Sequence, residues 1–168
     1  MTRANLSDAA LARLAARVGS RLHSENRQVA TAESCTGGWI AKCMTDIDGS
    51  SQWFTEGFVT YSNEAKTRAL GVPLAALKRS GAVSEAVARA MALGALRRAG
   101  AQAAVAVTGI AGPGGAVPGK PVGTVWTAWA SRRGRQVTVT TRLQRFTGDR
   151  ETVRRKTVRS ALAGLLLA

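Results

Sequence analysis

Apolar residues recur at helical spacing in several parts of the chain. Over residues 6–23 they form one stripe, and Ser7 and Asp8 are suited to the first turn of a helix. Ser62 and Ser84 stand where N-caps are expected, as does Asp149 in the last segment. The helices expected on this basis cover residues 6–23, 35–44, 63–70, 85–100 and 149–168.

Short β-prone runs lie between these helices. The last two runs are separated by the turn Arg132-Arg133-Gly134, which is typical of a hairpin. The strands expected are residues 28–33, 53–62, 101–109, 122–131 and 135–146. Because strands alternate with helices and the chain closes on a hairpin, the order predicts a three-layer α/β/α sandwich with a mixed central sheet. We expect residues 1–168 to form a single domain.

Composition indicates an ordinary globular protein, since 45% of residues are hydrophobic and 20% are charged. No apolar run reaches the roughly 18 residues that a membrane-spanning helix needs. The N-terminus also lacks the apolar core of a secretory signal. We therefore expect a cytoplasmic protein with no membrane partner.

Residues that commonly bind metal are few. Cys35 and Cys43 are the two cysteines, and no second pair completes a metal-binding framework. The single histidine, His23, falls in a polar stretch near the end of the first expected helix, where exposure is usual. We expect no metal site and no cofactor, and a general base is better sought among Lys, Tyr and carboxylate side chains.

The formal net charge is +14, which raises the question of nucleic acid. Such a charge also suits a small phosphorylated substrate, and a solvated arginine-rich surface explains it equally well. Few aromatic residues are interleaved with the basic ones, so the pattern disfavours a nucleic-acid platform.

The segment Ala32–Gly38 is the first candidate for chemistry. A strand ends on Ser34, Cys35 and Thr36, and Gly37-Gly38 lets the chain turn sharply into a helix. This arrangement exposes a hydroxyl or thiol beside free backbone N–H groups, which can stabilise an oxyanion. A polar helix cap followed by a close-packed Gly-Gly is the simpler alternative.

Three further segments carry candidate residues. Lys66 lies one helical turn beyond Ser62, close to Tyr61, and a lysine in an apolar cleft can act as a base for serine. A surface lysine paired with Glu64 is the alternative. Thr108 and Gly112 belong to a strand and glycine-rich loop that allow a ligand to approach, and Arg150 can reach a phosphate or carboxylate.

Taken together, these segments resemble a known family. The blocks TAESCTGGWIA, GFVTYSNEAK, SGAVSEAVARAMA, VAVTGIAGPGG and TGDRETVR are similar, in the same order, to the C-terminal domain of CinA proteins. The resemblance runs from about Leu6 to the end and is closest to the stand-alone members, which are nicotinamide mononucleotide deamidases. The loop GGAVPGKP departs from the family, where a third glycine and an acidic residue are usual.

The resemblance implies hydrolysis of the carboxamide of nicotinamide mononucleotide, a small phosphorylated nucleotide, as part of pyridine nucleotide recycling. It makes Ser34 the nucleophile, Lys66 its base and Tyr61 a hydrogen-bonding partner. The substrate-binding residues it implies are Thr36, Gly37, Gly38, Thr108, Gly112 and Arg150. A homo-oligomer is expected. The competing hypotheses are a basic nucleic-acid-binding module and an amidase of another small substrate.

Overall fold

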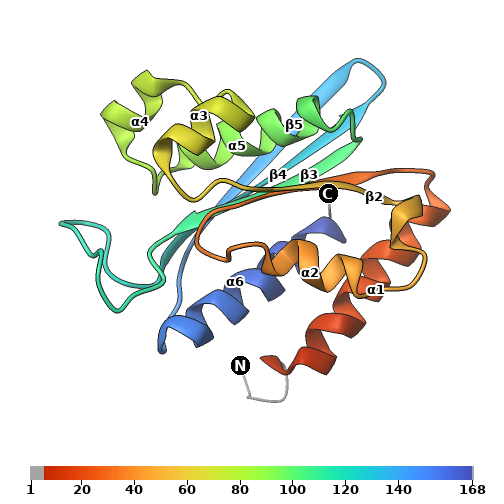
Figure 1. Ribbon diagram of the computed structural model, residues 1–168, viewed down its shortest axis with the longest axis horizontal. Helices are drawn as coiled ribbons and strands as arrows, with labels where there is room; N and C mark the ends of the chain where they lie inside the picture. The colour runs from red at the N-terminus through yellow and green to blue at the C-terminus, as the bar shows by residue number, and fades with distance from the viewer. Residues whose placement is uncertain (1–5, 168) are drawn as a thin grey trace.

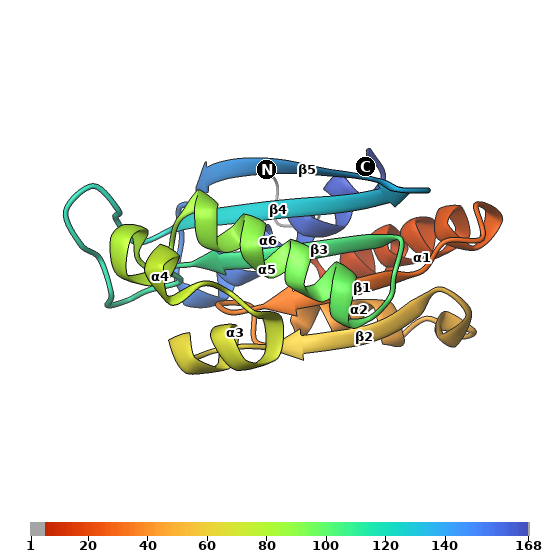
Figure 2. The ribbon, with the colours of Figure 1, turned by 90° about the horizontal axis from the view of Figure 1, so that it is seen from above.

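The computed structural model describes residues 6–167 and contains one five-stranded sheet in the order β2-β1-β3-β4-β5 (Figures 1 and 2). Strands β2, β1 and β3 are parallel, whereas β4 runs antiparallel to both β3 and β5. The strands are β1 Val29–Glu33, β2 Phe54–Val59, β3 Ala103–Gly109, β4 Thr124–Arg133 and β5 Gln136–Arg145. The mixed sheet predicted from the sequence is therefore confirmed.

Helices cover the sheet on both faces (Figure 1). On one face lie α1 Asp8–Ser24, α2 Trp39–Thr45 and α6 Arg150–Leu165. On the other lie α3 Asn63–Leu70, α4 Leu74–Ser80 and α5 Glu85–Arg98. This arrangement confirms the three-layer architecture. Within residues 6–167, no helix combines the length and apolar character needed to cross a membrane.

The central strands explain how the two layers pack. Strand β1 is buried along its whole length, and its side chains alternate between the faces. Val29 joins the apolar cluster beneath α1 and α6, whereas Ala30 and Ala32 join the cluster beneath α5. Strand β3 repeats the pattern, with Val105 and Val107 toward α6 and Ala104 and Ala106 toward α5. Small side chains on the α5 face let that helix lie close to the sheet.

Several expected boundaries need correction. Helix α2 begins at Trp39 rather than at residue 35, because the chain first makes a turn through Gly37 and Gly38. Helix α4 was not expected, since Gly71 and Pro73 indicate a break; it forms because Ala76 and Leu77 pack against the α5 cluster. A 3-10 helix at Ser50–Gln52 lies within the segment expected to be a turn.

The expected N-caps are confirmed. The side chains of Ser7, Ser62, Ser84 and Asp149 each accept a hydrogen bond from a backbone N–H in the first turn of their helix. Each cap satisfies a donor that the helix itself leaves unpaired. Local sequence therefore fixes where these four helices begin.

Neighbouring strands β1 and β2 send their following segments to opposite faces of the sheet. The chain leaves β1 toward α2, whereas it leaves β2 toward α3 on the other side (Figure 1). In open α/β sheets, a crevice for ligands forms at the carboxyl ends of strands where such a reversal occurs. The segments carrying Ser34 and Lys66 follow these two strand ends.

Candidate active site

Ser34 and Lys66 lie within hydrogen-bonding distance of each other. The Lys66 Nζ donates to Ser34 Oγ at 3.1 Å. Ser34 directly follows β1, where its N–H donates to the carbonyl of Val107 in β3. Lys66 reaches it from α3. Ser34 keeps 9% of its surface exposed and Lys66 only 1%. The two residues that the sequence singled out separately are thus brought together.

The surroundings of Lys66 are unusual for a lysine. Its Nζ also donates to the carbonyl oxygens of Thr60 at 2.8 Å and Tyr61 at 3.3 Å. Within residues 6–167 it forms no ion pair with a carboxylate. Burial lowers the pKa of Lys66, and the negative charge of Glu64 opposes that shift. A surface lysine paired with Glu64 is therefore the wrong description.

Glu33 is a site residue to which sequence reasoning gave no role. Its buried carboxylate accepts hydrogen bonds from the Thr36 hydroxyl at 2.6 Å and from three backbone N–H groups. Those N–H groups belong to Gly38 at 3.1 Å, Ile40 at 3.0 Å and Ala41 at 2.8 Å. Glu33 thus caps α2 from the face opposite Ser34, as strand alternation predicts. A carboxylate at the strand end, four residues before the Gly-Gly pair, is the signal in the sequence that could have revealed this role.

The turn between β1 and α2 depends on its two glycines. Gly37 and Gly38 have φ angles of +62° and +93°, a region that side chains disfavour. The Gly37 N–H donates to the Ser34 carbonyl, and that of Gly38 donates to Glu33. Neither donor is free for an oxyanion, so this part of the expected anion site is wrong. Within the described residues, no backbone carbonyl accepts a hydrogen bond from the N–H groups of Cys35 and Thr36.

Arg154 of α6 is a second residue that the sequence did not reveal. Its Nε donates to the carbonyl of Cys35 at 3.1 Å, and its Nη2 donates to that of Thr36 at 2.7 Å. The guanidinium also lies over the ring of Trp39, 5.2 Å from the centroid. Because 118 residues separate Thr36 from Arg154, only the tertiary fold brings them together.

Tyr61, Arg150 and Gly112 form a second connected group. Arg150 Nη2 donates to the Tyr61 hydroxyl at 3.0 Å, and its Nη1 donates to the Gly112 carbonyl at 2.7 Å. Tyr61 is 61% exposed. Its carbonyl, not its hydroxyl, contacts Lys66. Tyr61 is therefore linked to the glycine-rich loop through Arg150. Its link to Ser34 runs through its backbone carbonyl and Lys66.

Thr36 and Thr108 are both buried, and each hydroxyl already donates a hydrogen bond. The Thr36 hydroxyl donates to Glu33, and that of Thr108 donates to the carbonyl of Ala82 at 2.9 Å. Thr108 lies on the same face of the sheet as Ala106, toward α5. The Thr108 hydroxyl oxygen can still accept a hydrogen bond from a ligand. The Thr36 side chain is turned toward α2 and away from Lys66.

Cys35 adjoins Ser34 but differs from it chemically. Burial raises the pKa of the Cys35 thiol to about 12, so the thiol stays protonated near neutral pH. Burial also raises the pKa of Cys43 to about 11. Of the two neighbouring candidates for a nucleophile, the structure therefore favours the serine.

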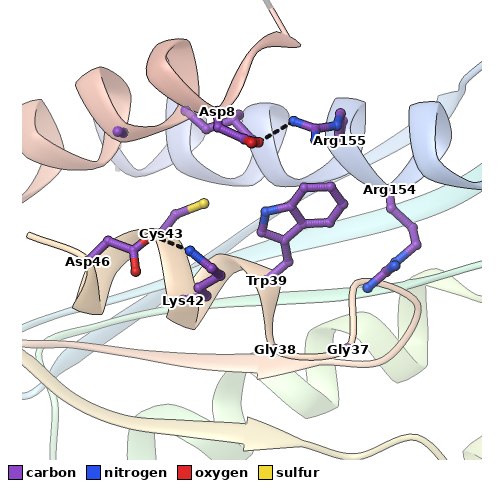
Figure 3. A pocket seen from close by; sticks show the side chains of 11 residues that line it. Asp8, Gly37, Gly38, Trp39, Lys42, Cys43, Asp46, Arg154 and Arg155 are labelled. Carbon is purple, nitrogen blue, oxygen red and sulfur yellow. Dashed lines mark hydrogen bonds and ion pairs between the residues drawn. The ribbon is translucent and has the colours of Figure 1, made fainter.

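A cavity of about 430 Å³ lies on the opposite side of the turn, between α1, α2 and α6 (Figure 3). Trp39 forms one wall, with the ion pairs Lys42–Asp46 and Arg155–Asp8 around it. Gly37, Gly38 and Arg154 complete its border. Ser34 and Lys66 do not line it. Among residues 6–167, no three His, Cys, Asp or Glu side chains are grouped as a metal site requires.

Known proteins resemble this chain over nearly its whole length. The family model described as the CinA C-terminal domain matches residues 11–168. Nicotinamide-nucleotide amidohydrolase PncC of Escherichia coli strain K12 is 52% identical over 160 residues, which is 95% of each chain. PncC of Pseudomonas putida is 55% identical over 153 residues, covering 91% of this chain and 93% of that protein.

Solved structures share the fold over nearly the whole chain. The competence/damage inducible protein CihA from Agrobacterium tumefaciens superposes with a TM-score of 0.90 at 45% identity, covering 96% of this chain and 95% of that one. A CinA superfamily protein from Escherichia coli gives a TM-score of 0.89 at 38% identity over 99% of this chain and 92% of that one. The chain belongs to the CinA C-terminal domain family.

Proposed function

We propose that this protein hydrolyses the carboxamide of nicotinamide mononucleotide, giving nicotinate mononucleotide and ammonia in the recycling of pyridine nucleotides. The observation that carries the proposal is the buried contact of 3.1 Å between Lys66 Nζ and Ser34 Oγ. The names of the PncC relatives supply the substrate, and their similarity extends over more than nine-tenths of this chain.

All three contacts of Lys66 Nζ can be kept when the ammonium loses a proton. A neutral amine has two N–H donors and one lone pair, whereas an ammonium has three donors and none. The carbonyls of Thr60 and Tyr61 can only accept, so they use both N–H donors. With both donors used, the lone pair of a neutral amine faces the third partner, Ser34 Oγ, so the contact in which Lys66 donates to Ser34 reverses and the hydroxyl donates. Lys66 is thereby arranged to accept the serine proton.

Hydrolysis then follows in two stages. Ser34 Oγ attacks the carboxamide carbon while its proton passes to Lys66 Nζ, and a tetrahedral intermediate forms. The Lys66 ammonium returns this proton to the amide nitrogen, the carbon–nitrogen bond breaks, and ammonia leaves. Water next adds to the acyl-enzyme ester with Lys66 again as base, which releases the carboxylate and restores Ser34.

The oxyanion of each intermediate needs hydrogen-bond donors. We assign this role to the N–H groups of Cys35 and Thr36, which have no backbone acceptor within the described residues. They belong to the same short turn as the nucleophile, as donors that receive a developing negative charge commonly do. Gly37 and Gly38 would then serve the turn rather than touch the oxyanion.

Arg150 and Tyr61 are suited to the rest of the substrate. Two N–H groups of Arg150 are engaged by Gly112 and Tyr61, so the guanidinium is held in place with donors left for a phosphate. The exposed ring of Tyr61 offers a flat surface to a pyridinium, whose positive charge favours an aromatic face. A mononucleotide provides both groups.

The test is ammonia release by the purified protein from a panel of amides, with a chelator present. Nicotinamide mononucleotide should be the best substrate, and free nicotinamide should be poor because it lacks the phosphate. Faster turnover of a different amide would instead favour the alternative of an amidase with another small substrate. Activity that is lost with chelator and restored by a divalent metal would contradict the metal-free mechanism.

A further inference from the structure

Arg154 holds the nucleophile turn from the side opposite Lys66. One edge of its guanidinium spans two successive carbonyls, with Nε on Cys35 at 3.1 Å and Nη2 on Thr36 at 2.7 Å. We propose that Arg154 is a positioning residue that orients and polarises the oxyanion donor of this turn. The inference rests on the proposed function, because it presumes that Ser34 is the nucleophile.

The orientation follows from the geometry of the peptide group. The carbonyl of Cys35 and the N–H of Thr36 belong to one peptide, and in a trans peptide the two bonds point in opposite directions. Fixing the carbonyl on Arg154 therefore directs the Thr36 N–H away from α6. The next peptide is held likewise, since the Thr36 carbonyl contacts Arg154 and the Gly37 N–H donates to Ser34.

The charge of Arg154 adds an electronic effect. A cationic donor on a carbonyl makes a stronger hydrogen bond than a neutral one and polarises the whole peptide. The Thr36 N–H thereby becomes a better donor. A tetrahedral oxyanion gains more from such a donor than the neutral amide oxygen of the substrate does. Losing Arg154 should therefore lower kcat and leave KM nearly unchanged.

The surroundings of Arg154 fit this role. Gly37 adopts φ +62°, which favours glycine, and Arg154 Nη2 lies 3.4 Å from the place of a Cβ, so the guanidinium packs directly against this turn. Trp39 supports the same guanidinium from α2. In Figure 3 the Arg154 side chain points toward the Gly37 turn, whereas that of Arg155 points toward Asp8.

Arg155 is a matched control. It is the next residue of α6, is partly buried, and also lies over Trp39, at 4.8 Å from the centroid. Its hydrogen bonds go to Asp8, Glu151 and the carbonyl of Leu6, and none goes to the Ser34 turn. A variant of Arg155 therefore removes a cation from the same environment without releasing the Cys35 and Thr36 carbonyls.

The experiment compares Arg154→Met, Arg154→Lys and Arg155→Met with the wild type. Steady-state kinetics on nicotinamide mononucleotide give kcat and KM, and the labelling rate with a fluorophosphonate reports Ser34 reactivity without that substrate. Both Arg154 variants should lose about 100-fold in kcat, the scale of losing one oxyanion donor, with KM within about threefold. Lysine at this position keeps the positive charge but lacks the paired N–H donors of a guanidinium, so Arg154→Lys should not restore kcat.

Labelling of both Arg154 variants should slow in parallel with kcat, and Arg155→Met should stay within about threefold of wild type in both measurements. Thermal denaturation identifies variants that are merely less stable, and assays are run well below each Tm. An Arg154→Met protein with normal kcat, or an Arg154→Lys protein with full activity, would overturn the positioning role.

The wild type separates this inference from the proposed function. Labelling at Ser34 without ammonia release from nicotinamide mononucleotide would overturn the proposed substrate, and the labelling rates would still decide on Arg154. Labelling that persists in Ser34→Ala would overturn the proposed nucleophile, and the inference on Arg154 would fall with it.

Discussion

At the scale of single residues, Lys66 is unfavourable for folding when it is charged, but its burial suits the proposed chemistry. A buried lysine without an acidic partner is unfavourable in its charged form, so such residues are rare in protein interiors. Here three oxygen atoms surround the Nζ and the side chain is 1% exposed. The same burial lowers the pKa of Lys66, which makes the neutral amine accessible.

Ser34 and Lys66 should act as one unit. Ser34→Ala and Lys66→Ala should each lower kcat by about 10³-fold or more, and the double variant should lose little beyond the worse single one. Lys66→Arg should be nearly as inactive as Lys66→Ala, because a guanidinium stays protonated and cannot accept the serine proton. Ammonia release under saturating substrate measures all four proteins.

Cys35→Ala is the control for these variants. It should keep most of the activity, since burial holds the pKa of that thiol at about 12. Near-normal turnover by Lys66→Arg would show that Lys66 only anchors charge, and Tyr61 would be the next candidate base. An active Ser34→Ala beside an inactive Cys35→Ala would assign the nucleophile to the cysteine.

The activity should depend on pH through Lys66. Only the neutral amine can accept a proton, so kcat/KM should rise with pH and level off above the pKa of Lys66. Because burial lowers that pKa, the plateau should begin below the value of about 10.4 for an ordinary lysine. The negative charge of Glu64 opposes the shift, so Glu64→Gln should move the rising limb to lower pH. A rising limb that moves to higher pH in Glu64→Gln would contradict the assignment of Lys66 as the base.

At the scale of elements, β1, the following turn and α2 form a unit held by Glu33. The buried carboxylate satisfies N–H donors that a helix start leaves unpaired, and it reaches them from the preceding strand. Opposite it, Ser34 faces α3 and contacts Lys66. One strand end thus fixes the helix on one side and presents the hydroxyl on the other, because successive side chains of a strand alternate.

Glu33→Gln should destabilise the protein by about 2 kcal/mol, on the scale of a buried polar group left unpaired. The reason is that all four partners of the carboxylate donate, so the amide nitrogen of glutamine would face a donor. Urea unfolding measures the free energy. Glu56→Gln on β2 is the matched control, since Glu56 is exposed, and it should change stability little. Equal effects of the two substitutions would argue against the capping role.

At the scale of the whole molecule, the net charge of +14 is the most conspicuous property. The candidate site accounts for only part of this charge, through Arg150 and Arg154. Strand β5 at the edge of the sheet is largely exposed and carries two arginines, Arg142 and Arg145. A positive surface attracts phosphorylated ligands at long range without conferring specificity.

Salt separates a small substrate from a nucleic-acid polymer. Binding to DNA or RNA should be weak and should fall steeply as salt rises from 50 to 200 mM, because bound counterions are released. Turnover of nicotinamide mononucleotide, which carries a single phosphate, should change by only a few-fold over the same range. Fluorescence anisotropy with a labelled oligonucleotide and the ammonia assay test this. Tight, salt-resistant nucleic-acid binding would revive the binding-module hypothesis.

The sequence determined much of this protein by local means. Helical spacing and the caps Ser7, Ser62, Ser84 and Asp149 specified where four helices begin. The alternation of strands and helices specified the mixed sheet. Motif resemblance identified the family, and it pointed to Ser34 and Lys66 before their distance was known. These features depend on residues close together in the chain or on blocks with a fixed order.

Tertiary structure decided what depends on distant segments meeting. Helix α4 forms because Ala76 and Leu77 pack on α5, although its sequence begins beside helix-breaking residues. Glu33 takes the N–H donor of Gly38 and leaves those of Cys35 and Thr36. Arg154 of α6, far along the chain, donates hydrogen bonds to the Cys35 and Thr36 carbonyls of the turn. A periodic pattern specifies which face of an element is buried, but not which side chain from elsewhere will occupy each hydrogen-bonding group, and that is settled only when the layers pack.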